Sequence, residues 1–342
     1  MHTIKLSICI PTRNFGKYLR QTLQSIAEQD CAGIEVVIVD GGSTDDTPDV
    51  VAGYQKLLPA LNYIRQEKAR GVDRDLDTVV SQARGEYCWL MSADDALKPR
   101  ALAALLQELT PGVDTYLCNR TICDINLNPV EDIFWLQQKI GDRVYDFTNQ
   151  AEIQSYFESA VSLGALFSYI STIVFRRECW NQVAPNEQVL GTNYAHVYKL
   201  FLLLFESKGC HRYIRQPLVL TRGNNDSFLE GGHAGVVKRY LIDIDGYHLL
   251  GAILFPEKKL RAAFLGVMRH EHSWVMINRI AIRVSEDDVW LRIRAKLSDC
   301  GYTSGQLFVI GWVRRLDRLM SISRVVRAIR KRPKLHPTRK SI

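Results

Sequence analysis

The sequence lacks the cysteine and histidine spacings that build zinc sites and disulfide frameworks. Its eight cysteines stand at positions 9, 31, 88, 118, 123, 179, 210 and 300 and include no CxxC pair. Cys118 and Cys123 are the closest two, and no histidine follows them at zinc-site spacing. We therefore expect buried free thiols, as is typical of a reducing cytoplasm.

Long apolar runs are also missing. The longest, Leu200–Phe205 and Leu249–Phe255, are far shorter than the roughly 18 residues that cross a bilayer. The N-terminal run meets Pro11 too early for a signal peptide. Neither GxGxxG nor GxxxxGK[ST] occurs, which removes the main support for a nicotinamide-dependent oxidoreductase or a P-loop enzyme. The sequence predicts a cytoplasmic protein without a membrane span.

What is present is an ordinary globular composition with unevenly distributed charge. The chain has 342 residues, 46% of them hydrophobic and 24% charged, and a formal net charge of +7. Residues 312–342 hold eleven Lys or Arg and one acid, or +10, so the other 311 residues carry −3. The body is long enough to bury a sizeable core. The positive charge therefore belongs to the tail.

The first 120 residues alternate strand and helix signals. Short apolar runs, several of them rich in Ile and Val, predict strands near residues 6–10, 35–40, 61–65, 86–91 and 115–118. Helical spacing of apolar residues and capping signals predict four helices. One begins at Tyr18, a second ends at about Leu58, a third covers residues 72–84 and a fourth runs from Pro99 to Leu109. This alternation predicts an α/β fold with a mostly parallel sheet flanked by helices. Residues 151–205 look helical, 211–222 look like a strand, and 236–329 look mainly helical with breaks near Pro256 and Gly301.

Polar and acidic residues follow three of these strands directly. They are Thr12-Arg13-Asn14, Asp40 before two glycines, and the segment Ser92–Asp95. Ligands bind at the carboxyl ends of strands in such sheets, so we expect one pocket there. Asp94 and Asp95 suit Mg²⁺ or Mn²⁺, which prefer oxygen ligands. A turn that caps the next helix would explain the same two carboxylates without a metal.

Three segments, in this order, resemble family 2 glycosyltransferases of the GT-A fold. They are residues 7–14 (SICIPTRN), 35–45 (EVVIVDGGSTD) and 85–95 (GEYCWLMSADD). Residues 71–75 (GVDRD) together with 85–90 are most similar to abequosyltransferase-like members that build O-antigen side chains. The clear match covers about residues 5–110, or a third of the chain.

The resemblance implies transfer of a sugar from a nucleotide diphosphate donor to an acceptor hydroxyl. Its implied nucleotide-sugar contacts are Pro11, Thr12, Asn14, Asp40, Arg74, Ser92 and Asp94. It implies Mg²⁺ or Mn²⁺ on Asp94 and Asp95, where the ion would stabilise the diphosphate leaving group. Ser92 stands where the family usually has an acid. Similarity to abequosyltransferases suggests a CDP-linked deoxysugar and a place in lipopolysaccharide biosynthesis.

Two residues of the second half are candidates for catalysis. Arg222 lies in a segment that resembles the strand and loop that fold over the diphosphate in this family. There it would neutralise the charge of the leaving group. The alternative is an arginine on a solvated loop. The stretch that should carry the catalytic base, residues 189–201, contains no acid, and His196 is its nearest titratable group. His196 would be the base of an inverting reaction, an acceptor-orienting group in a retaining one, or a structural histidine.

The basic tail predicts an amphipathic helix over residues 312–334. Trp312, Leu316, Leu319, Ile322, Val326 and Ile329 follow helical spacing, and arginines fill the other faces. Such a helix suits an anionic membrane surface, here the inner face of a bacterial cytoplasmic membrane that carries a lipid-linked saccharide acceptor. A helix packed on the body is the alternative. Nucleic acid is not expected, because stacking aromatic residues are sparse there.

We therefore expect a GT-A domain over residues 1–230, with a nucleotide-sugar half (1–120) and an acceptor half (121–230). A helical C-terminal region follows over residues 231–342. The alternative function is a noncatalytic nucleotide-sugar-binding or membrane scaffold, because Ser92 and the missing acid near His196 would also mark a degenerate site.

Overall fold

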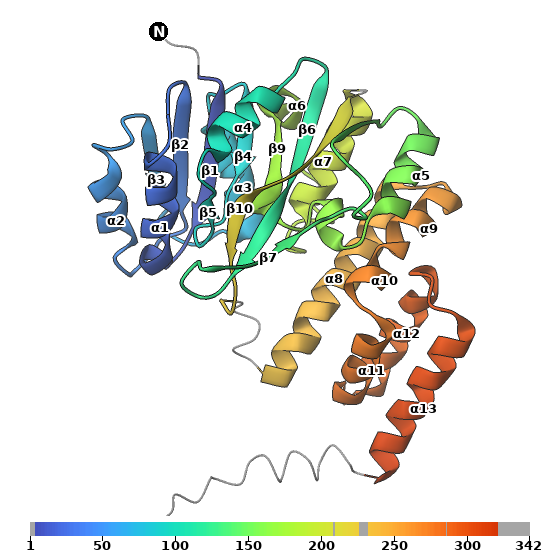
Figure 1. Ribbon diagram of the computed structural model, residues 1–342. Helices are drawn as coiled ribbons and strands as arrows, with labels where there is room; N and C mark the ends of the chain where they lie inside the picture. The colour runs from blue at the N-terminus through green and yellow to red at the C-terminus, as the bar shows by residue number, and fades with distance from the viewer. Residues whose placement is uncertain (1–3, 208, 226–231, 285, 321–342) are drawn as a thin grey trace, which may run out of the picture.

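A computed structural model describes residues 4–207, 209–225, 232–284 and 286–320 of the chain. At its centre lies a ten-stranded sheet in the order β3-β2-β1-β4-β9-β6-β10-β5, with β7 paired to β6 and β8 to β10 (Figure 1). The strands are β1 (Leu6–Thr12), β2 (Ile34–Asp40), β3 (Leu61–Arg65), β4 (Tyr87–Leu90), β5 (Ala96–Leu97), β6 (Val113–Cys123), β7 (Pro129–Ile133), β8 (Arg143–Asp146), β9 (Ile173–Arg176) and β10 (Cys210–Arg222). The predicted α/β fold with a mostly parallel sheet is confirmed.

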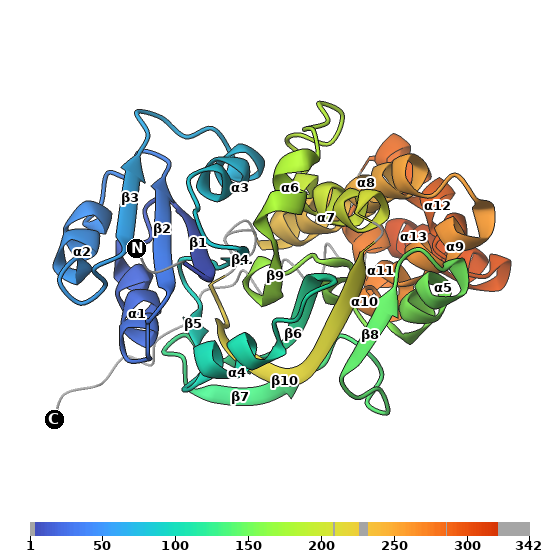
Figure 2. The ribbon, with the colours of Figure 1, turned by 90° about the horizontal axis from the view of Figure 1, so that it is seen from above.

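The first four strands run parallel because helices return the chain across the faces of the sheet. These helices are α1 (Gly16–Ala27), α2 (Thr47–Tyr54), α3 (Val72–Ser81) and α4 (Ala101–Glu108). Side chains of β1 alternate between the faces: Ile8 and Ile10 pack with α1, α2 and α4, and Cys9 packs with α3. Figure 2 shows α1 and α4 below the sheet and α3 above it.

The second half departs from the expected all-helical pattern at β9. The helices α5 (Gln150–Ser159), α6 (Arg177–Gln182) and α7 (Ala195–Glu206) form, but β9 lies between α5 and α6. It runs antiparallel to both β4 and β6 and joins the two halves of the sheet. An apolar run as short as Ile173–Phe175 looks the same in a strand and in a buried helix, so periodicity could not separate them.

The C-terminal region is helical, as expected. Its helices are α8 (Gly232–Leu254), α9 (Lys258–Gly266), α10 (Met268–Glu271), α11 (Trp274–Arg283), α12 (Asp287–Asp299) and α13 (Ser304–Met320). The chain breaks at Pro256 and Gly301, as predicted, and the core of these helices is continuous with that of α5 and α7. In the described parts of the chain, no helix is both long and apolar enough to cross a membrane. Residues 321–342, most of the basic tail, and the expected boundary at 230 lie outside the described residues.

All eight cysteines are free thiols, as predicted; five of them are buried and the other three are half-buried. Burial raises the pKa of Cys118 to about 12, so this thiol stays protonated at neutral pH. The cysteines therefore contribute packing and not chemistry.

Candidate functional site

A cavity of about 340 Å³ lies at the carboxyl ends of β1 and β4. These two strands are parallel neighbours, so their ends meet at one edge of the sheet. The first turn of α3 forms another wall. The cavity is lined by Pro11, Thr12, Arg13, Phe15, Ala69, Gly71, Val72, Asp75, Ser92, Ala93 and Ile170. The structure therefore brings together Pro11, Thr12 and Ser92 of the predicted set.

Two buried polar side chains that line this cavity, Thr12 and Asp75, and the half-buried Gln66 beside Asp75 carry the polar atoms of interest. The hydroxyl of Thr12 and Oε1 of Gln66 have no hydrogen-bond partner among the described residues. Asp75 accepts a hydrogen bond on Oδ1 from Nε2 of Gln66 at 3.0 Å, and burial raises the pKa of its carboxyl group. Buried polar groups without partners cost free energy. These oxygens therefore suit a ligand that supplies N–H or O–H donors.

Asp94 lies in the acidic turn, as we call Ser92–Asp95, and is half-buried. The Ser92 hydroxyl donates to its Oδ1, and Nδ2 of Asn225 donates to its Oδ2 at 2.7 Å. Carboxylate, hydroxyl and amide oxygens are the ligands that hard divalent cations prefer. No group of three or more His, Cys, Asp or Glu that could hold a metal occurs among the described residues. A divalent cation therefore fits Asp94 only if a bound diphosphate supplies further oxygens.

Asp95 is turned into the protein. Its Oδ2 accepts hydrogen bonds from the hydroxyls of Ser171 at 2.5 Å and Tyr169 at 3.0 Å, and its Oδ1 accepts the N–H of Arg222 at 3.1 Å. Burial, assisted by the charge of Asp94, raises the pKa of Asp95 to about 7. Asp95 is thus more buried than Asp94 and more fully bonded within the protein, and its direct contact with a metal stays a prediction.

Arg222 is also engaged within the protein. Its Nε donates to the backbone carbonyl of Asp94 at 3.0 Å, its Nη2 to Oε1 of Gln21 at 2.7 Å, and its Nη1 to the carbonyl of Ile125. The guanidinium also lies 4.7 Å from the centre of the Tyr18 ring. These three hydrogen bonds tie the acidic turn to the end of β10. The contact of Arg222 with a leaving group stays a prediction.

Asp40 and Asn14 organise the loops after β2 and β1. Asp40 is fully buried; its Oδ1 accepts the N–H and the hydroxyl of Ser43, and its Oδ2 accepts the hydroxyl of Tyr63 at 2.5 Å. Asn14 accepts the N–H of Thr44 at 2.7 Å and donates its own N–H to Ser43. Neither residue lines the cavity. Their contact with the nucleotide stays a prediction.

Asp73 links α3 to the start of α7. Its Oδ2 accepts the N–H groups of Gly191 at 2.8 Å and Asn193 at 3.1 Å, and its Oδ1 accepts that of Ala195 at 3.2 Å. These amides belong to the entry and first turn of a helix, where a carboxylate is favourable. Asp73 therefore fixes the start of α7 against the first turn of α3.

Arg74 and Asp75 differ in their relation to the cavity. Arg74 forms a surface ion pair with Glu187 at 3.8 Å and does not line the cavity, so its nucleotide contact stays a prediction. Asp75 does line it, although only Arg74 was predicted from the sequence. The signal was available in helical spacing: Asp75 precedes the buried Val79 by four residues, which places it on the buried face of α3.

His196 lies in the first turn of α7 and is buried. Its Nε2 donates to the carbonyl of Phe167 at 2.9 Å, which leaves Nδ1 as an acceptor without a partner among the described residues. Burial lowers the pKa of His196, so the imidazole is neutral at pH 7. His196 does not line the cavity. Its role as the base stays a prediction.

Sequence comparison places this chain among sugar transferases. Residues 7–158 match the profile described as "Glycosyl transferase family 2". The chain is 35% identical over 280 residues to abequosyltransferase RfbV of Salmonella typhimurium, covering 79% of this chain and 81% of the relative. It is 33% identical over 259 residues to the GalNAc(5)-diNAcBac-PP-undecaprenol beta-1,3-glucosyltransferase of Campylobacter jejuni, covering 75% and 76%.

Structural comparison finds the same fold in distant proteins. S. aureus TarS 1–349 in complex with UDP-GlcNAc superposes with a TM-score of 0.56 at 19% identity, covering 92% of this chain and 88% of that one. The mannosyltransferase PcManGT from Pyrobaculum calidifontis, in complex with GDP-Man and Mn²⁺, gives 0.55 at 17% identity, covering 94% and 89%. These likenesses concern the fold, which is GT-A-like.

Proposed function

The chain belongs to glycosyl transferase family 2 and is a nucleotide-sugar glycosyltransferase, and from that premise we propose that its acceptor is a lipid-linked saccharide of a growing cell-surface polysaccharide. The printed name of the Campylobacter relative, which includes an undecaprenol-linked diphosphate, supports a lipid-linked acceptor. Family membership sets aside the noncatalytic scaffold. We place the enzyme in the cytoplasm, peripherally on the inner face of the membrane.

One observation supports the donor site above others: a cavity with unpartnered polar groups lies one hydrogen bond from a half-buried carboxylate. Thr12 and Asp75 line the cavity, and Ser92 both lines it and donates to Asp94. We assign the nucleoside to the cavity and the diphosphate to the acidic turn. A divalent cation held by Asp94 would stabilise the departing diphosphate. The protein's own part is to orient the donor and to hold Asp94 in place.

Release of nucleoside diphosphate tests the proposal. The protein is incubated with UDP-, GDP- and CDP-sugars, Mn²⁺ and a bacterial lipid extract, and the product is extracted into organic solvent. We expect one nucleotide class to be turned over and the sugar to appear in the lipid phase. Release that is equally fast with water-soluble saccharides and without lipid would contradict a lipid-linked acceptor.

Asp75→Asn tests the assignment of the cavity to the nucleoside. The substitution keeps the shape but replaces one acceptor oxygen by a donor nitrogen, so a base N–H that faced the carboxylate would lose its partner. We expect the affinity for the preferred nucleoside diphosphate to fall about tenfold, as measured by titration calorimetry. Arg74→Gln, one residue away on the surface, is the control. Equal losses of affinity in the two variants would show that the nucleoside does not bind in this cavity.

His196 remains the proposed base. A base must be unprotonated to accept the proton of the acceptor hydroxyl. Because burial lowers the pKa of His196 below its usual 6.5, we expect the rate of transfer to fall only when the pH is below 6.5. We expect His196→Gln to lower kcat about a hundredfold at saturating acceptor and to remove that acidic limb. The pH profile of kcat is the measurement. Near-normal transfer with an unchanged profile would make His196 structural.

A further inference from the structure

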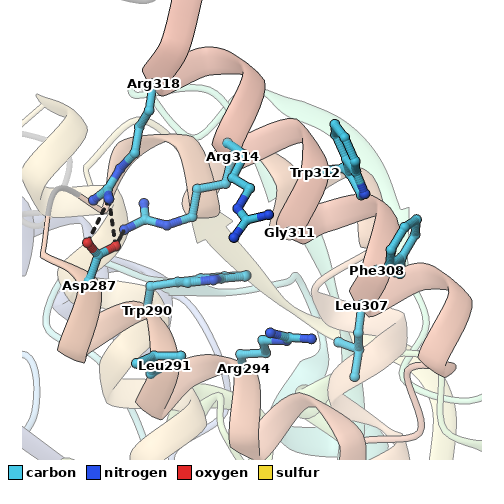
Figure 3. Close-up of a pocket in the computed structure, with 11 residues that line it drawn as sticks. Asp287, Trp290, Leu291, Arg294, Leu307, Phe308, Gly311, Trp312, Arg314 and Arg318 are labelled. Atoms are coloured by element: carbon cyan, nitrogen blue, oxygen red, sulfur yellow. Dashed lines mark hydrogen bonds and ion pairs between the residues drawn. The ribbon is translucent and has the colours of Figure 1, made fainter.

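A groove of about 480 Å³ lies between α12 and α13, away from the donor cavity. Figure 3 shows its two walls, with Trp290, Leu291 and Arg294 on α12 facing Phe308 and Trp312 on α13. Nothing in the transfer reaction derived above uses these residues. The groove is therefore a second candidate binding site, separate from the donor cavity.

The groove is strongly cationic. Four arginines line it, at positions 294, 314, 315 and 318, against one acid, Asp287, which gives a local charge of +3. Asp287 is already neutralised, because it accepts hydrogen bonds from Arg314 at 2.9 Å and Arg318 at 2.6 Å. Arg294 and Arg315 are exposed and have no hydrogen bond or ion pair within the described part of the chain. Two guanidinium groups are thus free for an external anion.

The rim of the groove is apolar and exposed. Phe308 is 63% exposed, Leu291 59% and Trp312 49%, and the rings of Phe308 and Trp312 lie 6.3 Å apart. Aromatic rings next to cationic side chains are typical of protein surfaces that enter the headgroup layer of a membrane. A site for a small soluble anion would not need this apolar rim.

We propose that this groove binds the phosphate groups of anionic phospholipids, with Arg294 and Arg315 on the phosphates and Phe308 and Trp312 among the headgroups. Guanidinium groups match phosphate oxygens in geometry and charge. The chain's own tail does not fit the groove, because residues 321–342 carry eight Lys or Arg and no acid. The proposal extends the lipid-linked acceptor proposed above to a defined membrane contact.

The position of the groove agrees with this assignment. In Figure 1, α13 descends toward the side of the molecule at which β10 ends. Strand β10 is parallel to β6. Because β9 is antiparallel to both β6 and β4, these two strands also run in the same direction. The carboxyl ends of β4, β6 and β10 therefore point to this side. A bilayer in contact with α13 would lie on the side of the sheet that carries the donor cavity, where a lipid-linked acceptor is needed.

Vesicle co-sedimentation of the full chain tests the proposal. The wild type is compared on phosphatidylcholine vesicles with and without phosphatidylglycerol, at low and at physiological salt. The groove variant combines Arg294→Glu with Arg315→Glu. The matched control combines Lys258→Glu with Lys259→Glu on α9, where both lysines are exposed and the change in net charge is the same. A third variant, Phe308→Ser with Trp312→Ser, leaves the charge unchanged.

We expect the groove variant to lose at least about tenfold in partition onto phosphatidylglycerol vesicles, since each basic residue at such a surface contributes on the order of 1 kcal/mol. The lysine control should lose less than about threefold, because its charges are not at the contact. The serine variant should also lose several-fold. Equal losses in the arginine and lysine variants, or an unaffected serine variant, would overturn the proposal. So would tighter binding of the wild type to a single-stranded oligonucleotide with the same arginine dependence.

Nucleotide affinity separates this proposal from the transferase proposal. All three variants should bind the nucleoside diphosphate as the wild type does, because the groove lies apart from the cavity. Lost vesicle binding with intact nucleotide affinity supports the groove, whatever the acceptor proves to be. Intact vesicle binding in the arginine variant overturns the groove and leaves the transfer reaction as proposed.

Discussion

Replacing Asp94 with asparagine is expected to lower the rate of sugar transfer about a thousandfold while the protein stays folded. Asp94 is the half-exposed carboxylate of the acidic turn: Ser92 and Asn225 each donate one hydrogen bond to it, whereas Asp95 is buried and faces the protein interior. Asparagine keeps its volume but removes the charge. Stabilisation of the leaving diphosphate would be lost, and with it most of the rate enhancement.

Calorimetry adds a readout for Asp94 that does not depend on turnover. Mn²⁺ should strengthen the binding of nucleoside diphosphate to the wild type and have little effect on Asp94→Asn. Asp49→Asn, an exposed acid on α2, serves as the control and should behave as the wild type. A variant at Asp94 that keeps full Mn²⁺ dependence would show that the cation is held elsewhere.

Arg222→Met is expected to lower the free energy of unfolding by about 4 kcal/mol. The buried guanidinium donates to the carbonyls of Asp94 and Ile125 and to Gln21, and methionine leaves these acceptors without donors. One of the lost hydrogen bonds holds the backbone of Asp94, so the rate of sugar transfer should fall as well. We expect this rate to fall in proportion to the loss of Mn²⁺-dependent nucleotide binding. Chemical denaturation and calorimetry measure the two effects.

Arg215→Met on the same strand is the matched control for Arg222. Arg215 is half-buried, donates one side-chain hydrogen bond to the carbonyl of Ile140 and stacks on Phe134. Its replacement should cost about 1 kcal/mol and leave transfer unchanged. If Arg222→Met were as stable as the wild type and yet inactive, Arg222 would act on the leaving group itself, as first expected from the sequence.

The nucleotide-sugar half was predictable because its signals are local. The β-branched runs of β1 and β2 and the polar residues that follow them lie in single segments, and parallel pairing brings such segments to one edge of the sheet. This reasoning expected Thr12, Ser92 and Asp94 near one pocket; in the structure Thr12 and Ser92 line one cavity and Asp94 is hydrogen-bonded to Ser92. It also predicted the breaks of the C-terminal helices, because Pro and Gly act through the backbone alone.

The remainder depends on distant partners. Asp94 and Asp95 are adjacent acids that the sequence does not distinguish, and hydrogen bonds from Tyr169, Ser171 and the backbone of Arg222 hold Asp95 inward. Likewise Arg222 looked like a loop cation until its three acceptors were known. The groove between α12 and α13 could not be predicted either, because Arg314, Arg315 and Arg318 were assigned to an amphipathic tail, and nothing in the sequence shows that Arg294 of α12 lies opposite them.

The first turn of α3 separates two tasks that stand two residues apart. Asp73 accepts hydrogen bonds from three amides at and before the start of α7, whereas Asp75 lines the cavity and accepts a hydrogen bond from Gln66. A change at position 75 can therefore alter which donor is accepted without loosening the joint between the halves. We therefore expect substitutions at position 75 to change nucleotide binding and substitutions at position 73 to lower stability.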